Sequence, residues 1–394
     1  MRIAMFSDNF YPELSGISDS IITTGKELAR RGHEIAYYAP HYSEKDYTVM
    51  HLPDVATIGP GTAIHRLPSL RFPAGTGTAQ AAIPVLTSYP SLRRFNPDVI
   101  HFHHIFGAGM EAVFESRLLG KPLVETNHTP IVEFASYSPV KAGWIKRFLV
   151  HYDAWFFNRS NFVSSPTRLI FENMEYIDRT IPHRAVSNPI DTDEFRPAKR
   201  TGNRAAKKKR PFTIFYAGRL AEEKKIDVVI RAAARVRTAV PDIRVIIAGR
   251  GAYEARLRAL VQSLDMERNV VFAGFVPDEK LVSYYAESDI FAIMGTAETQ
   301  SIVAMQALAC EIPVIAADAW GFKEYITPGV GFLIKPNDVE AVAEKIIYLY
   351  KHPAVRAAMG KKGRAQVEHY SIANIATTWE GIYRDVIARY NTKA

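Results

Sequence analysis

The sequence predicts an α/β protein of two domains, each built on a mostly parallel sheet. The chain has 394 residues, of which 47% are hydrophobic and 23% charged, and this composition is typical of a folded protein. A chain of this length usually has more than one hydrophobic core. Short apolar runs alternate with helix-length segments in both halves, a pattern typical of parallel sheets covered by helices. A basic segment at 199–210 separates the two series of runs.

The apolar runs predict the strands in chain order. In the first half the strands are expected at 2–7, 33–39, 98–103, 122–127 and 162–166. In the second half they are expected at 212–218, 243–249, 270–274, 290–295, 313–317 and 331–336. Helices are expected where apolar residues recur at three- and four-residue spacing, as at 228–236 and 342–350, and a last amphipathic helix is expected at 370–390.

Glycine residues end several of the second-half strands directly before a predicted helix, at Gly218, Gly249 and Gly274. Ligands of open α/β sheets bind outside the carboxyl ends of the strands. We therefore expect the ligand site at that edge, and the main pocket in a cleft between the two domains.

The net charge of +8 is concentrated in one segment. Lys199 to Arg210 hold seven basic residues and no acidic one, which leaves a net charge of about +1 for the rest of the chain. Such a run indicates a solvated linker, with contact to an anionic membrane or to nucleic acid as alternatives. No aromatic residues are interleaved with the basic ones, so we expect no nucleic-acid partner.

A single cysteine, Cys310, excludes an intrachain disulfide and any multi-cysteine metal site, and it fits a reducing compartment. His101, His103 and His104 suggest a metal by their number, but alternating residues on a buried strand need none, and we expect no metal. No segment reaches the ~18 uninterrupted apolar residues of a spanning helix. We therefore expect a cytoplasmic protein, with peripheral contact at the cytoplasmic membrane face left open.

Two cations, Arg219 and Lys224, follow the first strand of the second half and suit a diphosphate ligand. The alternative is a solvated helix start with charge pairs involving Glu222 and Glu223. Glu298 precedes a helix expected to begin between Thr299 and Ser301, whose free amides can bind phosphate. By itself, a carboxylate such as Glu298 at a helix N-terminus is more often a capping residue than a ligand contact.

Eight segments, in this order, resemble the family 4 glycosyltransferases of the GT-B fold, which are retaining enzymes that use nucleotide-activated sugars. The segments are YPELSGIS (11–18), ELARRGHEI (27–35), PDVIHFHH (97–104), ETNHTP (125–130), VSNPIDTDEF (186–195), AGRLAEEK (217–224), IAGRGA (247–252) and residues 298–317. The resemblance implies two Rossmann-like domains facing each other across a cleft. Residues 1–196, completed by the helix at 371–394, would bind the acceptor; 197–210 would be the linker; and 211–370 would bind the nucleotide sugar.

The resemblance also implies roles for individual residues. Arg219 and Lys224 would grip the donor diphosphate, Glu298 would contact the sugar hydroxyls, and His128 would lie at the reacting sugar. Fixed cations stabilise a leaving diphosphate without a bound metal, so no metal or other cofactor is expected. The full set of implied donor-binding residues is Gly16, Gly218, Arg219, Lys224, Gly249, Glu298, Ser301, Ile302, Val303 and Gln306. For His128 the alternative is a strand-end histidine bonded to backbone, and for Gly16 and Gly249 it is a turn glycine.

The sequence departs from the family pattern at several positions. Gln306 stands where a glutamate usually holds the ribose, and the exchange is expected to weaken that contact by roughly 1–2 kcal/mol. The usual Asn-Gly is Asn188-Pro189, the usual Lys-Gly is Lys224-Lys225, and the usual Pro-Ser is Met294-Gly295. These changes bear on donor identity more than on the fold.

The acceptor side is expected in residues 129–158. Trp144, Lys146, Arg147 and Phe148 are candidates for contact with an acceptor or a membrane interface. Core packing with a solvated basic edge explains this pattern equally well, and contact with a protein partner is a third interpretation. The region resembles, more loosely, that of glycolipid-forming members with diacylglycerol-type acceptors.

The predicted function is therefore retaining, metal-independent transfer of a hexose from a nucleotide sugar, expected to be a UDP-sugar, to a hydroxyl group. The acceptor is expected to be a membrane lipid such as diacylglycerol, or a glycan. A nucleotide-sugar epimerase and a non-catalytic nucleotide-sugar-binding protein on the same fold are the alternatives. The sequence predicts no particular oligomeric state.

Overall fold

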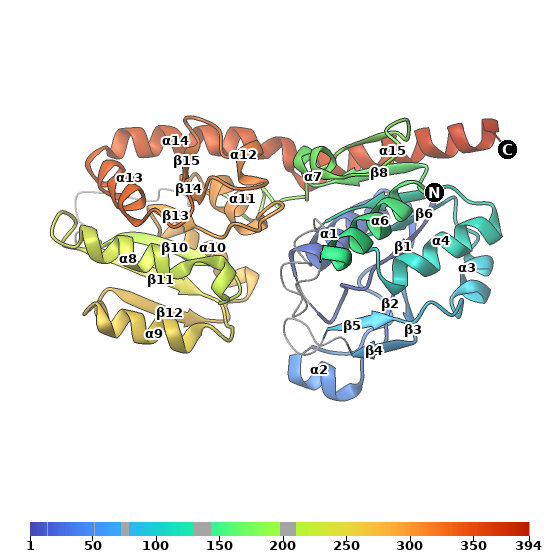
Figure 1. The fold of residues 1–394 in the computed structure, drawn as a ribbon, viewed down its shortest axis with the longest axis horizontal. Coiled ribbons are helices and arrows are strands. Elements are labelled where there is room, and N and C mark those ends of the chain that lie inside the picture. Colours follow the sequence, from blue (N-terminus) through green and yellow to red (C-terminus); the bar gives the residue numbers. More distant parts are fainter. Residues whose placement is uncertain (14, 51, 72–78, 129–142, 198–209, 394) are drawn as a thin grey trace. The chain divides into compact units, whose positions relative to one another are not determined.

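The computed structural model describes residues 1–13, 15–50, 52–71, 79–128, 143–197 and 210–393. The chain forms two compact units, Met1–Pro189 with Ile372–Ala394, and Ile190–Ser371. Each unit is a parallel sheet with helices packed against it, the Rossmann-like architecture that the sequence predicts (Figure 1). Most of the predicted linker, and the first part of the predicted acceptor region, lie outside the described residues.

The first unit has a seven-stranded sheet in the order β3-β2-β1-β6-β7-β8-β9, and its neighbouring strands pair in parallel. Its strands are β1 (Arg2–Phe6), β2 (Glu34–Pro40), β3 (Thr62–Leu67), β6 (Val99–Phe102), β7 (Leu123–Thr126), β8 (Phe162–Ser165) and β9 (His183–Ala185). A separate antiparallel pair consists of β4 (Ser69–Arg71) and β5 (Gln80–Ala82). The predicted strands of this half are confirmed, whereas β3, β4, β5 and β9 are additional.

Helices cover both faces of this sheet. They are α1 (Gly16–Arg30), α2 (Glu44–Met50), α3 (Tyr89–Phe95), α4 (Gly107–Leu119), α6 (Gly143–Phe157), α7 (Arg168–Asn173) and α15 (Ile372–Lys393). Successive residues of a strand point to opposite faces, so Ile3 and Met5 join a core with α1 and α15, while Ala4 and Phe6 join a second core with α4 and α6. The central strand is therefore buried on both sides.

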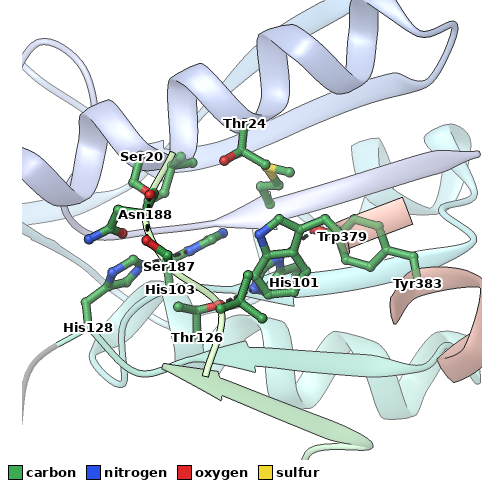
Figure 2. A pocket seen from close by; sticks show the side chains of 13 residues that line it. Ser20, Thr24, His101, His103, Thr126, His128, Ser187, Asn188, Trp379 and Tyr383 are labelled. Atoms are coloured by element: carbon green, nitrogen blue, oxygen red, sulfur yellow. Dashed lines mark hydrogen bonds between the residues drawn. The ribbon is translucent and has the colours of Figure 1, made fainter. Parts of the chain in front are cut away.

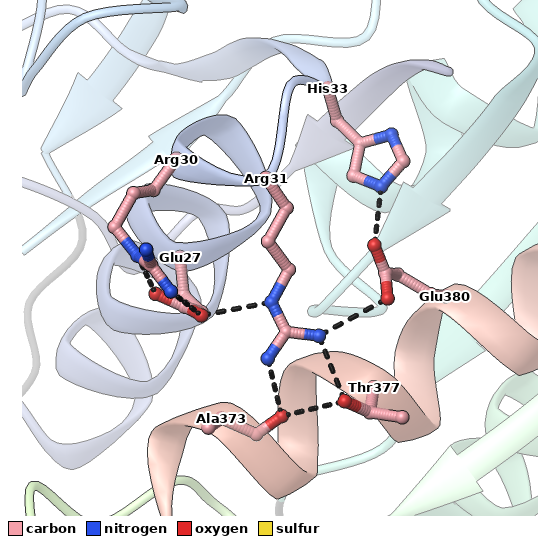
Figure 3. A network of polar contacts seen from close by, with 7 residues as sticks. All are labelled: Glu27, Arg30, Arg31, His33, Ala373, Thr377 and Glu380. Carbon is pink, nitrogen blue, oxygen red and sulfur yellow. Dashed lines mark hydrogen bonds and ion pairs between the residues drawn. The ribbon is translucent and has the colours of Figure 1, made fainter.

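A polar network fastens α15 to α1 (Figure 3). The Arg31 guanidinium donates to Glu27 Oε1 at 2.8 Å, to Glu380 Oε2 at 3.1 Å and to the Ala373 carbonyl at 2.7 Å. His33 Nε2 lies 2.8 Å from Glu380 Oε1. Hydrogen bonds from Arg30 and Arg31 lower the pKa of Glu27 to about 2. The last helix of the chain is thus held in the first unit by charge-assisted contacts as well as by its apolar face.

The second unit has a six-stranded sheet in the order β12-β11-β10-β13-β14-β15. Its strands are β10 (Phe212–Ala217), β11 (Ile243–Ala248), β12 (Val270–Gly274), β13 (Ile290–Ile293), β14 (Val314–Ala317) and β15 (Gly331–Ile334). Each coincides with a predicted strand. The sheet runs outward in both directions from β10 and β13, which is the doubly wound order of nucleotide-binding domains.

In the sequence, the helices of the second unit alternate with these strands or follow β15. They are η2 (Glu222–Lys224), α8 (Ile226–Val236), α9 (Glu254–Ser263), α10 (Asp278–Ala286), α11 (Ile302–Ala309), α12 (Phe322–Tyr325), α13 (Val339–Lys351), α14 (Pro353–Val367) and η3 (Glu368–Tyr370). Residues 190–196 group with this unit rather than with the first one. Ile190 bridges to Ser371, and the Phe195 ring packs edge-on against Tyr285 with 5.9 Å between centroids. The boundary therefore falls earlier than the predicted residue 196.

Among the described residues, no helix has the length and apolarity needed to cross a membrane.

Candidate functional site

The loops after β10 and β13 bring together two of the predicted site residues. These strands are neighbours at the point where the sheet order reverses, so the segments at their carboxyl ends lie side by side. Lys224 Nζ is 2.5 Å from Glu298 Oε1, and the two side chains are 22% and 16% exposed. A cation and a carboxylate that are 74 positions apart in the sequence thus form a partly buried pair.

Gly295 provides the space for this pairing. A Cβ atom built on Gly295 would lie 3.3 Å from Lys224 Cα and 3.3 Å from the Glu223 carbonyl oxygen. Such a distance is tight for any side chain, so the chain after β13 approaches the Lys224 backbone most easily with glycine at this position. The Met294-Gly295 departure from the family pattern therefore has a steric explanation within the site.

Arg219 lies at the same edge but has a different partner. Its Nη2 donates to Glu223 Oε1 at 2.8 Å, and half of the Arg219 side chain is exposed. This i,i+4 pair is the kind of contact expected if residues 219–224 were only a solvated helix start with charge pairs. Exposed pairs of this kind contribute little to stability, so a more highly charged anion can replace Glu223 as the partner of Arg219.

The glycines at the strand ends have a packing reason of their own. Gly218 and Gly249 have φ values of +145° and +139°, and a Cβ on Gly249 would lie 1.9 Å from the Gly218 carbonyl oxygen. A Cβ on Gly251 would lie 2.2 Å from the Leu220 carbonyl oxygen. The loops after β10 and β11 therefore touch through their backbones, and contact of Gly218 or Gly249 with a ligand stays a prediction.

Helix α11 begins where the sequence places it. Ser301 is the N-cap, its Oγ accepts from the Ala304 N–H at 3.4 Å, and its own N–H donates to Tyr325 Oη at 3.0 Å. The Ser301 amide is therefore engaged inside the protein. Since the first amides of a helix have no acceptor within it, Ile302 and Val303 supply the N–H groups best placed for an anion.

Gln306 is buried on α11 and faces a tyrosine of α10. Tyr285 Oη lies 3.1 Å from Gln306 Oε1 and 2.8 Å from the Val303 carbonyl oxygen. A phenol has one proton, so only one of these two contacts can be a bond that it donates. Tyr285 therefore contacts both the first turn of α11 and the side chain that stands where the family has glutamate.

In the first unit, Gly16 occupies the first position of α1 and is exposed. Ser15 caps the helix with Ser18, and Ser15 Oγ donates to Asn9 Oδ1 at 2.5 Å. The loop after β1 thus ends in a fixed helix start. Any contact of Gly16 with a ligand stays a prediction.

His128 belongs to a buried histidine cluster at the carboxyl ends of β6 and β7 (Figure 2). His128 Nε2 lies 3.1 Å from His103 Nδ1. His101 makes two further contacts, with Tyr383 Oη at 2.8 Å and with Thr126 Oγ1 at 2.7 Å. Burial lowers the pKa of His128 to about 3 and the pKa values of His101 and His103 well below the ordinary range. All three imidazoles are therefore neutral at pH 7.

These histidines surround a pocket of about 10 Å³, which also has side chains from α1 and α15 in its wall. That volume holds about one water molecule. Within the described ranges no group of three or more metal-binding side chains has a geometry that could hold an ion. Independence from metals stays a prediction, because other parts of the chain and the substrates can also supply ligands.

The candidates for acceptor or membrane contact form one exposed surface on the first two turns of α6. Trp144 and Phe148 are 66% and 60% exposed, and Lys146 and Arg147 between them are exposed as well. Phe156, in the last turn, is fully buried. Core packing therefore applies to the last turn of α6, which is buried, whereas the start of the helix faces outward and is available for contact with an acceptor or a membrane.

Sequence reasoning missed a pair of buried carboxyl groups on β7 and α6, Glu125 and Asp153. Glu125 accepts from Ser160 Oγ at 3.2 Å, and Asp153 accepts from Asn127 Nδ2 at 3.0 Å. Burial, together with the neighbouring acid, raises the pKa of Glu125, and burial raises the pKa of Asp153 to about 7. No sequence pattern distinguishes such acids from surface ones, because their burial depends on the packing of α6 against β7.

Two family models match consecutive parts of the chain. The model described as "Glycosyltransferase Family 4" matches residues 14–194, and the model described as "Glycosyl transferases group 1" matches residues 199–366. The boundary between the matches falls in the basic segment or just before it.

Characterised relatives match along the whole chain. A "GDP-mannose-dependent alpha-mannosyltransferase" of Mycobacterium tuberculosis is 29% identical, covering 100% of this chain and 99% of the relative. An "Alpha-monoglucosyldiacylglycerol synthase" of Acholeplasma laidlawii is 22% identical over 100% of this chain and 99% of its own. Among solved structures, sucrose-phosphate synthase from Thermosynechococcus elongatus superposes with a TM-score of 0.76 at 20% identity, covering 98% of this chain and 99% of that one.

Proposed function

Because the chain belongs to the family 4 glycosyltransferases of the GT-B fold, we propose that it moves a hexose from a nucleoside diphosphate sugar to an acceptor hydroxyl. The observation that carries this proposal is the pairing of Lys224 with Glu298 where the second sheet reverses its strand order. Sheets of this order bind nucleotides at that edge. The pair sets a cation suited to phosphate beside a carboxylate that accepts from sugar hydroxyls.

The second unit binds the donor through several groups. Lys224 and Arg219 hold the diphosphate, and Arg219 exchanges its exposed contact with Glu223 for the ligand. The amides of Ile302 and Val303 at the start of α11 favour negative charge. Glu298 binds hydroxyl groups of the sugar, and Gln306 contacts the ribose.

In the proposed reaction the acceptor oxygen forms a bond to the anomeric carbon on the face from which the diphosphate leaves. The carbon–oxygen bond to the diphosphate breaks, and a leaving phosphate oxygen takes the proton of the acceptor hydroxyl. Configuration is retained, and no carboxylate pair of the kind used in glycoside hydrolysis is required. Lys224 and Arg219 stabilise the charge that develops on the diphosphate. His128 is the predicted catalytic residue of the first unit.

For the donor, we propose GDP-mannose as the first candidate. Relatives from two mycobacterial species that match nearly the full length of the chain carry GDP-mannose-dependent mannosyltransferase names. The sequence-based prediction of a UDP-sugar stays open as the second candidate. GDP-mannose and UDP-glucose differ both in the base and in the orientation of the sugar 2-hydroxyl, so one panel of nucleotides and sugars separates them.

For the acceptor, we propose a membrane lipid with a free hydroxyl. The support is the exposed start of α6, where Trp144 and Phe148 flank Lys146 and Arg147. Aromatic and basic side chains together suit the interface of an anionic membrane. The A. laidlawii relative carries a glycolipid synthase name, which supports the same acceptor class. This surface would place the protein peripherally at a membrane.

The proposal is tested by incubating the protein with GDP-mannose, UDP-glucose or UDP-N-acetylglucosamine and with diacylglycerol, phosphatidylinositol or a short glycan. We expect one donor to give a product heavier by one hexose, with an α-anomeric signal in the NMR spectrum and unchanged turnover in EDTA. Interconversion of the donor without an acceptor would instead show an epimerase. Tight donor binding without any product would favour the non-catalytic alternative.

A further inference from the structure

His103 and His128 face each other through two ring nitrogens that lie within hydrogen-bond distance. His103 directly follows β6 and His128 follows β7, and these parallel neighbours bring the two side chains to the same edge of the sheet. His103 Nδ1 and His128 Nε2 are 3.1 Å apart, and both residues are buried. The two nitrogens are close enough for a hydrogen bond.

Only one proton can occupy this contact. Both rings are neutral, since burial depresses their pKa values far below 7, and a neutral imidazole has one N–H and one bare nitrogen. In one arrangement His103 donates through Nδ1 and its Nε2 is bare. In the other, His128 donates through Nε2, and the proton of His103 must sit on its own Nε2.

The surroundings of His103 Nε2 favour the first arrangement. This atom is fully buried, and within the described residues it has no hydrogen-bond partner. A buried N–H without an acceptor is destabilising and is rarer in proteins than a bare acceptor. The side chains of described residues in the wall of the adjacent pocket include hydroxyls but no carboxylate that would demand a proton from this nitrogen.

We propose that His103 is a positioning residue that holds His128 in the tautomer protonated on Nδ1, so that His128 presents a hydrogen-bond donor on the side of its ring away from His103. His103 Nδ1–H donates to His128 Nε2, which is thereby occupied as an acceptor. With its second nitrogen protonated, His128 cannot remove a proton from an acceptor hydroxyl. The tautomer itself does not depend on the proposed function. Its consequence for turnover does rest on that function, because there His128 donates a hydrogen bond to a substrate oxygen rather than acting as a base.

The tautomer can be read directly from histidine side-chain nitrogen shifts of the selectively ¹⁵N-labelled full-length protein at pH 8, without substrate. The His128 signals are assigned by their loss in His128→Asn. We expect a protonated Nδ1 and a bare Nε2 for His128. His33 is the internal control with the opposite tautomer, because its Nε2 contacts the Glu380 carboxylate, which can only accept. A His128 signal with the proton on Nε2 would overturn the proposal.

A matched pair of variants separates positioning from packing. His103→Asn keeps an N–H donor near the position of Nδ1, whereas His103→Leu has almost the same shape and no donor. We expect His103→Asn to retain the His128 tautomer and turnover within about threefold. His103→Leu should lose the Nδ1–H preference and lower kcat about tenfold with little change in the donor KM. Equal tautomers and equal kcat in the two variants would contradict the role. Absence of transfer by the wild type would count against the proposed function alone, because the nitrogen shifts would still report the tautomer.

Discussion

At the scale of single residues, the site depends on pairings that the residue types alone suggest but do not specify. Arg219, Lys224 and Glu298 were identifiable because their segments resemble family motifs, yet the pairing of Lys224 with Glu298 depends on the meeting of β10 and β13. The structure pairs Lys224 with Glu298 and leaves Arg219 with Glu223. The buried acids Glu125 and Asp153 give no sequence signal, since an acidic residue in a strand or helix reads as solvent-facing.

Replacing Gln306 by glutamate tests its position in the site. Tyr285 Oη lies 3.1 Å from the Gln306 side chain and can donate to a carboxylate there. A carboxylate accepts hydrogen bonds from ribose hydroxyls more strongly than an amide oxygen does. We expect Gln306→Glu to bind the nucleoside diphosphate equally well or up to about tenfold more tightly, measured by calorimetry. Markedly weaker binding with an unchanged melting temperature would show that this position does not face the ribose.

The pH dependence of stability tests the burial of Asp153. Burial raises its pKa to about 7 in the folded protein, against an ordinary value near 4. The folded state therefore favours the protonated acid, and its contribution to stability is present at low pH and is lost as the pH rises through about 7. Asp153→Asn removes this dependence. Relative to wild type, the free energy of unfolding of the Asp153→Asn variant should rise between pH 4 and pH 7 by up to about 1.4 kcal/mol per pH unit.

Urea unfolding at several pH values measures this difference. Asp178→Asn is the matched control, because Asp178 is exposed and hydrogen bonds from Thr180 lower its pKa rather than raising it. A gap between Asp153→Asn and wild type that stays constant across the pH range would show that the Asp153 carboxyl is ionised in the folded protein.

At the scale of elements, apolar runs predicted every strand of the second sheet and the central strands of the first, but missed β3 and β9 at the edges of the first sheet. Every predicted strand is present because central parallel strands are continuous apolar runs. The edge strands β3 and β9 carry histidine and arginine, which is common at exposed sheet edges and hides them from an apolar pattern. In helix α6 the aromatic residues look alike in the sequence, but those at its start are exposed and Phe156 in its last turn is buried.

The exposed start of α6 predicts binding to anionic membranes. Trp144→Ser combined with Phe148→Ser should lower partitioning onto vesicles that contain phosphatidylglycerol by about tenfold or more in sedimentation, because two interfacial aromatic side chains are lost. Leu70→Ser is the matched control, since Leu70 lies on β4 and is as exposed as Trp144, at 66%. Equal sedimentation of the double variant and wild type would remove α6 from the membrane contact.

At the scale of the whole molecule, the chain leaves the first unit after Pro189 and returns to it with α15. The sequence alone gave little reason to assign the last helix to one half, since an amphipathic helix fits either sheet; the family resemblance supplied that assignment. In the structure Trp379 and Tyr383 pack into the first core, where Tyr383 also contacts His101. The first unit is therefore completed only by the last residues of the chain.

Trp379→Ala should destabilise the first unit selectively. Trp379 is buried, and truncation of a buried tryptophan typically costs about 3–5 kcal/mol. We expect calorimetry to show a lower melting temperature for the first unit. The transition of the second unit, identified because added nucleotide raises its melting temperature, should stay at the wild-type temperature. A single transition that falls as a whole would show that the two units unfold together.

The most direct test of the central claim is the rate of hexosyl transfer by Lys224→Met, compared with wild type and with Arg235→Ala. Methionine keeps the apolar stem of Lys224 and removes the charge next to Glu298. Arg235→Ala removes only an exposed ion pair of the second unit, which Arg235 forms with Glu340 at 3.0 Å. The account predicts that Lys224→Met lowers kcat/KM by about 100-fold or more, while Arg235→Ala leaves it unchanged. Full turnover by both Lys224→Met and Glu298→Gln would contradict the assignment of the site.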